Sequence, residues 1–256
     1  MSFLFHSEKE LINKDGKRID GRGLYDLRPI KLEVGLLDKA DGSALLVQGK
    51  NRILAAVYGP REAHPKHIAL PHRAVLRCRY HMAPFSVDER KSPAPSRREQ
   101  EISKVIREAL EPAVLSEYYP RTTIDLFVEV LQSDGGSRCA GINAASLAIA
   151  DAGIPMKGLV AACAAGKIAG RVALDMSDTE DKQGDADLPV AYIPRTDRVS
   201  LLQMDGTLSQ EEFDEALSLA IKACKEIHVQ QQAALKEKYV KIKEEVEKLP
   251  SKEVTQ

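Results

Sequence analysis

Alternating apolar and polar residues mark strands in the first half of the chain, and a longer period marks one helix. We predict strands at Ile30–Val34, Ser43–Val47, Arg52–Val57, Val75–His81 and Thr122–Leu131, with the second and third joined as a hairpin. Apolar residues spaced three and four apart predict a helix from Arg97 to about Tyr118. Ser96 and Glu99 form a capping-box pattern that marks where this helix begins.

The second half of the chain shows a similar order of elements. Ala140–Asp151 is small and apolar, which predicts a buried helix packed closely on a sheet. We then expect a hairpin over Leu159–Leu174 that turns around Gly166, and strands near Val190 and Val199. A terminal helix begins at Gln210, where Ser209 and Glu212 form a second capping-box pattern, and becomes strongly charged toward its end.

The recurrence of hairpin, helix and strand predicts a duplicated βαβα core. No stretch rich in Pro, Gly or Ser separates the two halves. We therefore expect a single α+β domain over residues 1–249, with two pseudo-repeat lobes and a long C-terminal helix. Residues 250–256 are expected to form a disordered tail.

A glycine turn between the Thr122–Leu131 strand and the following helix is the first candidate site. Gly135 and Gly136 allow a sharp turn, and Ser137 and Arg138 then lie at the start of the helix. The unpaired N–H groups of a helix N-terminus, a hydroxyl and a guanidinium together favour an anion. An ordinary strand-to-helix turn would show the same residues, so both interpretations stay open at this point.

An acidic segment at residues 175–187 holds six Asp or Glu in thirteen residues, between apolar strands. Charge runs of this kind are usually solvated loops. Carboxylates held between packed strands also suit a divalent metal, since Mg²⁺ takes one or two carboxylates together with substrate oxygens. The acidic segment and the glycine turn together suggest phosphoryl chemistry.

A basic stretch from Arg52 to Arg98 contains ten Lys or Arg against three Asp or Glu, although the formal net charge of the whole chain is −1. Arg97 and Arg98 fall in the first turn of the predicted helix, where the helix dipole disfavours cations. An anionic partner would explain their position, and solvated arginines without a ligand are the alternative. Affinity for nucleic acid would have to come from such a local basic surface.

Composition narrows the class of protein. The chain has 256 residues, of which 43% are hydrophobic and 29% charged, enough for a substantial core. It contains no run of apolar residues that would span a membrane, and Met1–Lys17 lacks the apolar stretch of a signal peptide. Four cysteines without CxxC spacing indicate neither a zinc site nor a disulfide framework. We therefore expect reduced thiols and a cytoplasmic protein.

Five short motifs occur in one order along the chain, namely Asp20-Gly21-Arg22, Tyr80–Phe85 with Asp88–Arg90, Ser96–Glu99, Gly136–Arg138, and Glu180-Asp181 with Asp187. The set resembles the RNase PH family, and within it the catalytic RNase PH-like subunits of archaeal exosomes. The resemblance runs from about Lys17 to Lys243.

The resemblance implies an RNase PH-like fold (ribosomal protein S5 domain 2-like). It also implies phosphorolytic 3′-to-5′ degradation of single-stranded RNA, with release of nucleoside diphosphates and a reverse reaction that adds tails. Inorganic phosphate is then the co-substrate and Mg²⁺ or Mn²⁺ the cofactor. The implied partners are a non-catalytic RNase PH-like paralogue in a hexameric ring (a trimer of heterodimers) and RNA-binding cap proteins, without a membrane.

The same resemblance assigns roles to residues. Phosphate is expected at the glycine turn and two arginines, that is, at Arg98, Gly136, Ser137 and Arg138. Asp187 is the candidate metal ligand or general acid, and Asp181 would share the metal or hold Asp187 in place. An ordinary Asp pKa of about 4 favours metal ligation. Contacts to RNA are expected from Arg97, Arg61, His64 and Lys66.

Three other functions remain as alternatives. A homohexameric RNase PH that trims tRNA 3′ ends would share the same residues. A non-catalytic RNA-binding ring subunit would need neither Asp187 nor the Gly-Ser-Arg turn. A hydrolytic metal nuclease would use the acids but not a phosphate site. A P-loop nucleotide-binding fold is disfavoured because the glycine turn lacks Gly-Lys-Ser/Thr.

Overall fold

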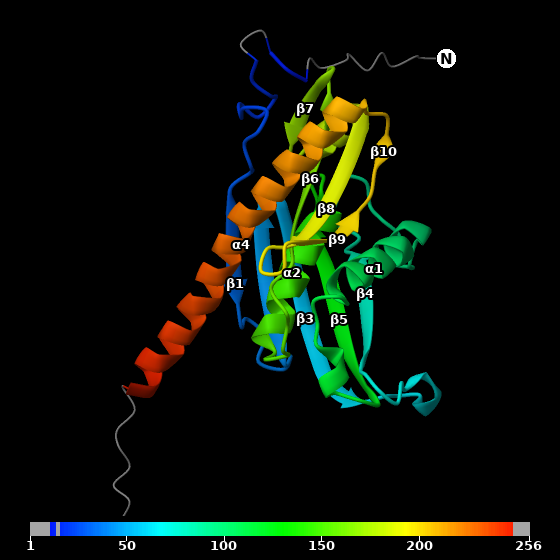
Figure 1. Cartoon of the computed structure of the whole chain (residues 1–256), viewed down its shortest axis with the longest axis vertical. Coiled ribbons are helices and arrows are strands. Elements are labelled where there is room, and N and C mark those ends of the chain that lie inside the picture. The colour runs from blue at the N-terminus through cyan, green and yellow to red at the C-terminus, as the bar shows by residue number, and fades with distance from the viewer. Residues whose placement is uncertain (1–10, 14–15, 248–256) are drawn as a thin grey trace, which may run out of the picture.

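Two sheets enclose one helix in the computed structural model, which describes residues 11–13 and 16–247 (Figure 1). The tail predicted at 250–256 lies outside the described residues, as do both ends of the domain predicted for 1–249. The described part is mixed α and β and ends in a long helix, so the predicted α+β class is confirmed.

The first sheet has the strand order β1-β2-β3-β5-β4. Its strands are β1 (Ile30–Val34), β2 (Gly42–Gln48), β3 (Asn51–Glu62), β4 (Val75–Met82) and β5 (Thr122–Gln132). The pairs β1–β2, β2–β3 and β3–β5 are antiparallel, and β4 lies parallel to β5 at the edge. All five predicted strands and the β2–β3 hairpin are therefore confirmed.

The second sheet is antiparallel, with the order β10-β8-β6-β7 and with β9 also paired to β8. Its strands are β6 (Ala161–Ile168), β7 (Arg171–Leu174), β8 (Ala186–Ile193), β9 (Arg198–Leu202) and β10 (Asp205–Gly206). The hairpin turn predicted around Gly166 is wrong. The turn lies at Ala169 and Gly170, whose φ angles of 47° and 73° suit a two-residue hairpin, while Gly166 pairs inside β6.

Helix α1 (Arg97–Leu110) ends well before Tyr118, where the prediction placed its end. Pro112 explains the difference, because it has no N–H to donate and its ring clashes with the preceding turn of a helix. Short 3₁₀ turns occupy Ser116–Tyr118 and Lys66–Ile68. A further helix, α3 (Asp178–Gln183), forms inside the acidic segment, where we expected only a loop.

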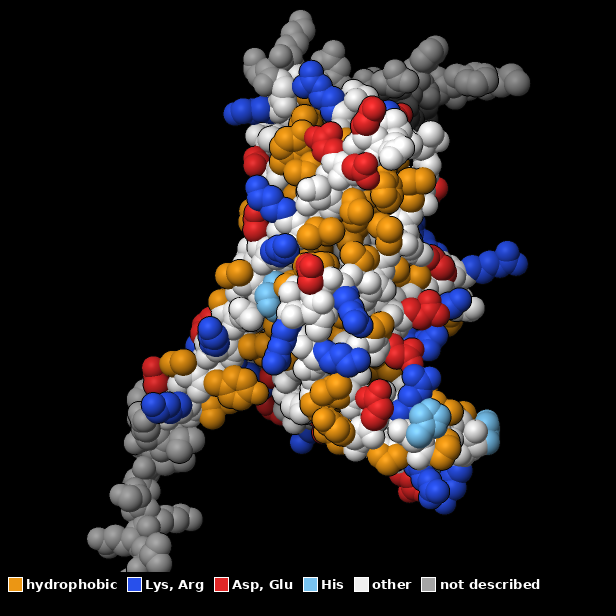
Figure 2. Space-filling view, viewed as in Figure 1, with side chains coloured by type: hydrophobic (Ala, Val, Ile, Leu, Met, Phe, Trp, Pro, Cys, Tyr) orange, Lys and Arg blue, Asp and Glu red, His pale blue; other side chains and the backbone are white. Residues whose placement is uncertain are grey.

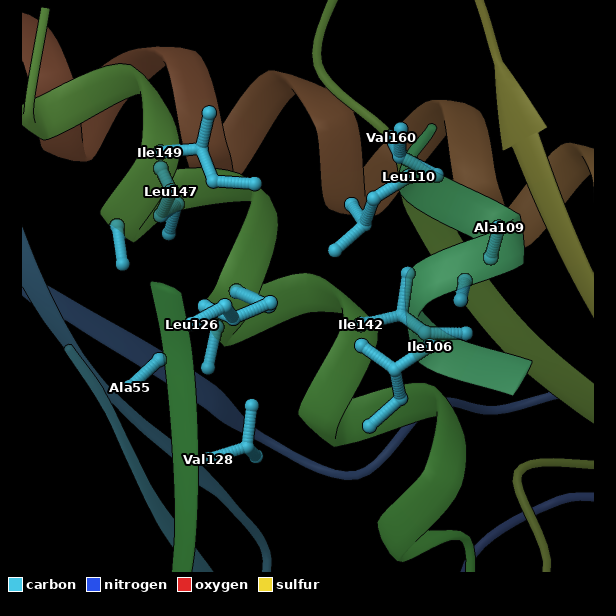
Figure 3. Packing of buried hydrophobic residues seen from close by; sticks show 14 of the residues in the cluster. Ala55, Ile106, Ala109, Leu110, Leu126, Val128, Ile142, Leu147, Ile149 and Val160 are labelled. Carbon is cyan, nitrogen blue, oxygen red and sulfur yellow. The ribbon is translucent and has the colours of Figure 1, made fainter. Parts of the chain in front are cut away.

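Helix α2 (Ser137–Asp151) lies between the two sheets and is buried along almost its whole length. Its alanines and other small residues let both sheets approach it closely, because a helix that is apolar on all sides is stable only inside a protein. Figure 3 shows Ile142 and Leu147 of α2 packed near Leu126 and Val128 of β5 and Ile106 of α1.

Helix α4 (Gln210–Glu247) covers the opposite face of the second sheet. Its first half buries Ala216, Ala220, Cys224 and Ile227 against β6 and β8, and its last turns extend beyond both sheets (Figure 1). The predicted capping box forms, since Ser209 and Glu212 exchange hydrogen bonds of 2.9 and 3.2 Å. Within the described part of the chain, no helix is long and apolar enough to cross a membrane.

The position of α2 predicts which substitutions destabilise the fold. Leu147 is fully buried, so Leu147→Ala should lower the free energy of unfolding by about 2–5 kcal/mol through lost burial and a new cavity. Tyr239→Ala, at a side chain on α4 that is 57% exposed, should change it by less than about 0.5 kcal/mol. Denaturant unfolding measures both, and equal losses would contradict this account of the core.

Candidate active site

A cavity of about 950 Å³ opens where β5 ends and where α1 and α2 begin. Six of the residues predicted for the site line it: Arg98, Gly136, Ser137, Arg138, Asp181 and Asp187. They come from α1, the glycine turn with α2, α3 and β8. The fold therefore brings together the basic, anion-binding and acidic segments that lie far apart in the sequence.

The glycine turn has the backbone conformation that its sequence indicates. Gly135 and Gly136 have φ angles of 71° and 64°, in the left-handed region that residues with a Cβ rarely adopt. The first hydrogen bond of α2 runs from the Ala140 N–H to the Gly136 carbonyl at 3.1 Å. The N–H groups of Ser137 and Arg138 precede that bond and thus have no partner inside the helix. Together with the helix dipole, they form an anion-binding end of α2 in the cavity.

The Ser137 hydroxyl is held from behind by Tyr80. The Tyr80 hydroxyl donates to Ser137 Oγ at 2.8 Å, and the Tyr80 side chain is only 2% exposed. Ser137 can therefore use its own hydroxyl proton for a ligand, because the bond from Tyr80 occupies it as an acceptor. Tyr80 belongs to the hydrophobic core and also orients a residue of the site.

Two arginines supply positive charge to the cavity. Arg98 is exposed at the start of α1, and no hydrogen bond or ion pair of its side chain is found within the described residues. Arg138 donates through Nη1 to Gln203 Oε1 at 2.8 Å and lies 3.6 Å from Glu101, while its buried Nε has no hydrogen-bond partner there. A buried donor without an acceptor is costly, and an anion in the cavity could satisfy it.

The two candidate acids interact with each other. Burial, and then the negative charge of Asp181, raise the pKa of Asp187 to about 7, against the opposing effect of Arg138. Burial also raises the pKa of Asp181, although Arg98 opposes this. Asp205, which lies opposite Asp187 in the β10–β8 pairing, raises both values further. At neutral pH Asp187 is therefore protonated in a substantial fraction of molecules, which an ordinary aspartate would not be.

The donor set of the cavity fits a hard divalent cation held in part by substrate. No cluster of three or more His, Cys, Asp or Glu that could hold a metal occurs among the residues that the structure describes. Asp181 and Asp187 nevertheless place excess negative charge in one place, as the raised pKa of each indicates. Two carboxylates completed by phosphate oxygens are an ordinary site for Mg²⁺.

The residues predicted for RNA contact lie outside the cavity. Arg97 is exposed in the same helical turn as Arg98. Arg61 pairs with Asp41 at 3.1 Å, and Lys66 with Glu62 at 3.5 Å. Arg61, Lys66 and His64 lie at the end of β3 that is far from the cavity. The strand begins beside the cavity and runs for roughly 30 Å to this far end. Figure 2 shows basic and histidine side chains gathered on this protruding loop.

Some residues of the cavity were missed by the sequence analysis. Lys50, at the tip of the β2–β3 hairpin, lines it, as do Arg90 and Phe85, whose side chain is 74% exposed. The sequence does not indicate which residues lie next to the tip of a hairpin in the folded protein. Phe85 and Arg90 belong to one of the five sequence motifs, which was the available signal, but no role was assigned to them.

Contacts from Arg18 and from the Asp20-Gly21-Arg22 motif hold the acidic segment in place, through Glu180 and the backbone near Asp175. Arg22 donates to the Asp175 carbonyl at 3.2 Å. The buried Arg18 pairs with Glu180 and donates to the Leu174 carbonyl at 2.5 Å. Glu180 is 1% exposed and therefore serves to hold α3 in place.

Comparison with known proteins places these features in a family. Residues 26–155 match the model of the 3′ exoribonuclease family, domain 1, and residues 158–223 match domain 2 of the same family. The exosome complex component Rrp41 of Thermococcus onnurineus is 64% identical over 237 residues, covering 93% of this chain and 95% of that protein. Rrp41 of Cenarchaeum symbiosum is 52% identical and covers 90% and 94%.

Solved structures agree on the fold. Rice (Oryza sativa) Rrp46 superposes with a TM-score of 0.78 at 27% identity, covering 86% of this chain and 100% of that one. A chain of the Archaeoglobus fulgidus exosome, solved with RNA bound to the active site, gives a TM-score of 0.73 at 23% identity and covers 88% and 93%. The expected RNase PH-like fold is therefore confirmed.

The raised pKa of Asp187 predicts a pH-dependent stability. Between about pH 4 and pH 7 the folded protein keeps a proton that the unfolded chain loses, so raising the pH through this window lowers stability. Asp187→Asn should be more stable than the wild type at pH 8 by about 1–3 kcal/mol, after allowance for the partial exposure of the site. The gain should disappear below about pH 4.

Denaturant unfolding in buffer without phosphate or divalent metal measures this difference. Asp185→Asn, at an exposed position two residues earlier, is the matched control and should show no such gain. A gain for Asp187→Asn that is the same at pH 4 and pH 8 would contradict the assignment.

Proposed function

The chain belongs to the 3′ exoribonuclease family, and we propose that it is the catalytic RNase PH-like subunit of an exosome. In this proposal it degrades single-stranded RNA from the 3′ end, with inorganic phosphate as the attacking group. It releases nucleoside diphosphates, and excess diphosphate drives the reverse reaction, which adds RNA tails. The identity of 52–64% to archaeal Rrp41 proteins, over at least 90% of the chain, supports the assignment to this subunit.

One observation carries the proposal. The anion-binding end of α2, two arginines and a pair of coupled carboxylates line the same cavity. A hydrolytic nuclease would need the carboxylates to act on a phosphodiester but would not need a second anion site. A scaffold subunit would need neither. Phosphorolysis needs both, because a free phosphate and an RNA phosphodiester must meet there.

The reaction is a displacement at phosphorus. Phosphate would bind at the amides at the start of α2, those of Gly136, Ser137 and Arg138. The Ser137 hydroxyl and the Arg98 and Arg138 side chains would also bind it. One of its oxygens bonds to the phosphorus of the terminal nucleotide, and the bond from that phosphorus to the 3′ oxygen of the preceding nucleotide breaks. The departing oxygen keeps the electron pair and takes a proton. Because two anions must approach each other, most of the catalysis is positioning and charge stabilisation.

We propose Asp187 as the donor of that proton. The sequence alone favoured metal ligation because an ordinary Asp is ionised at neutral pH, but a pKa of about 7 removes this objection. Asp181 supports the role, since its charge raises the pKa of Asp187. Asp187 regains a proton from solvent after each cycle.

Mg²⁺ or Mn²⁺ would be held by Asp181, and by Asp187 only while that carboxyl is ionised and is not acting as the proton donor. The excess negative charge of these two carboxylates fits such an ion, as described above for the donor set. When bound, the ion would supply Lewis acidity for the phosphate oxygens. Metal binding and protonation compete for Asp187, so metal affinity should fall as the pH drops below about 7.

We further propose that the chain works in a hexameric ring, where it alternates with a non-catalytic RNase PH-like paralogue and receives RNA through cap proteins. Arg61, His64 and Lys66 would contact the RNA backbone upstream of the cavity. Phosphate contacts carry no sequence information, so degradation should be non-specific and should weaken with salt. The four free cysteines are consistent with a reducing compartment such as the cytoplasm.

The proposal predicts RNA degradation that depends on phosphate. A labelled single-stranded RNA should be shortened only when phosphate and Mg²⁺ are both present, and Asp187→Asn should lower kcat by about 10²–10⁴-fold. The assay should be run with the chain alone and with its paralogue. A requirement for the paralogue distinguishes an exosome subunit from a homohexameric RNase PH. RNA that is bound but never shortened in either mixture would contradict the catalytic assignment.

Neighbouring arginines provide a second prediction. Arg98→Met should raise the KM for phosphate by about tenfold or more and leave RNA affinity nearly unchanged, because Arg98 lines the cavity. Arg97→Met, one residue earlier, should instead weaken RNA binding and reduce its salt dependence. Steady-state kinetics and RNA titrations at two salt concentrations separate the effects. The reverse pattern would show that the two roles are assigned to the wrong residues.

A further inference from the structure

A buried arginine holds the carbonyl side of the glycine turn. Arg28 precedes β1 and is 4% exposed. It donates through Nη1 to the Asp134 carbonyl at 2.5 Å and through Nη2 to the Gly135 carbonyl at 3.3 Å. These carbonyls belong to the peptide groups that come just before the N–H groups available to an anion. Holding the carbonyls therefore sets where those N–H groups point.

The Arg28 guanidinium also binds Asp175, the first residue of the acidic segment. Arg28 contacts the Asp175 carboxylate through Nη2 at 2.6 Å and through Nε at 3.1 Å, and its backbone N–H adds a bond of 2.8 Å. Asp175 is 3% exposed and has a φ of 53°, a conformation that is strained for a residue with a Cβ. Burial raises the pKa of Asp175, but the bonds from Arg28 outweigh it and hold that pKa below the ordinary value.

The two segments that Arg28 joins are in direct contact. A Cβ on Gly135 would lie 2.5 Å from the Asp178 nitrogen, so the turn packs against the first residue of α3, the helix that carries Asp181. Two side chains of the β2–β3 hairpin complete the connection. Asn51 donates to the Gly135 carbonyl at 2.7 Å, and Gln48 donates to Asp175 at 3.0 Å.

We propose that Arg28 and Asp175 are a positioning pair that fixes the phosphate-binding turn relative to the carboxylates of the active site. This inference rests on the proposed function and deepens it. Neither residue lines the cavity, so the pair acts through the backbone of the turn and through α3. An arginine suits this role because its rigid fork can bond two carbonyls and a carboxylate at once, which a lysine cannot do.

If Arg28 and Asp175 had a purely structural role, their substitution would change only the stability of the folded protein. A positioning role also changes how tightly phosphate binds and how fast it reacts. The test therefore compares Arg28→Lys, which keeps the charge but loses the fork, with Asn51→Ser, which frees the same turn without breaking the ion pair. Lys238→Met is the matched control, because it breaks the ion pair of the buried Asp151 at the other end of α2.

Each variant is assayed with its paralogue at a temperature at which unfolding curves show it to be folded. Arg28→Lys and Asn51→Ser should each raise the KM for phosphate by about tenfold and lower kcat by about ten- to a hundredfold, with the Kd for single-stranded RNA unchanged. Lys238→Met should lose stability but keep the KM for phosphate. If Arg28→Lys does not fold, Asn51→Ser gives the same readout.

Three results would overturn the inference. The first is a folded Arg28→Lys or Asn51→Ser with the kinetic constants of the wild type. The second is a rise in phosphate KM in Lys238→Met as large as in these variants, since stability alone would then explain it. The third is a wild type that shortens RNA without phosphate, which would refute the proposed function as well. Only this third result is obtained from the wild type alone, whereas the first two concern the variants, so the failure of the inference and the failure of the proposed function are distinguishable.

Discussion

The burial of α2 between two sheets is the constraint on which the site depends. Because the helix is packed on all sides, its N-terminus is held in place by the core, with its unpaired N–H groups at the edge of the cavity. The same packing holds Tyr80 against Ser137 and delivers α1 with Arg98 beside it. A rigid anion-binding end is what a reaction between two phosphates requires, since reorganisation during the reaction would add to the barrier.

The arrangement of charges in the cavity lowers the stability of the folded protein. Burial, together with the negative charges of Asp181 and Asp205, raises the pKa of Asp187 to about 7, so this carboxyl holds a proton in a substantial fraction of molecules at neutral pH. Arg138 leaves a buried donor without a partner among the described residues. Strained or unsatisfied groups of this kind gather at functional sites, where a ligand relieves them. The buried ion pair of Arg28 and Asp175 stabilises this region, because it holds the glycine turn and the acidic segment together.

Much of the fold could be predicted because local signals agreed with the tertiary structure. The capping boxes at Ser96 and Ser209 marked the starts of α1 and α4, and the uniform small residues of α2 indicated burial on every side. The end of α1 was misplaced because the apolar period continues past Pro112. The six cavity residues came from motifs, whereas Lys50 and Asp205 enter the site through a hairpin tip and a cross-strand pair. Such neighbours depend on tertiary contacts that one sequence does not reveal.

The central claim is that free phosphate is the attacking group at this site. Radiolabelled inorganic phosphate, supplied with unlabelled RNA, Mg²⁺ and the chain mixed with its paralogue, tests it most directly. The account predicts one label in the β-phosphate of every nucleoside diphosphate released. Unlabelled nucleoside monophosphates would show that water is the attacking group, and the account would then be wrong.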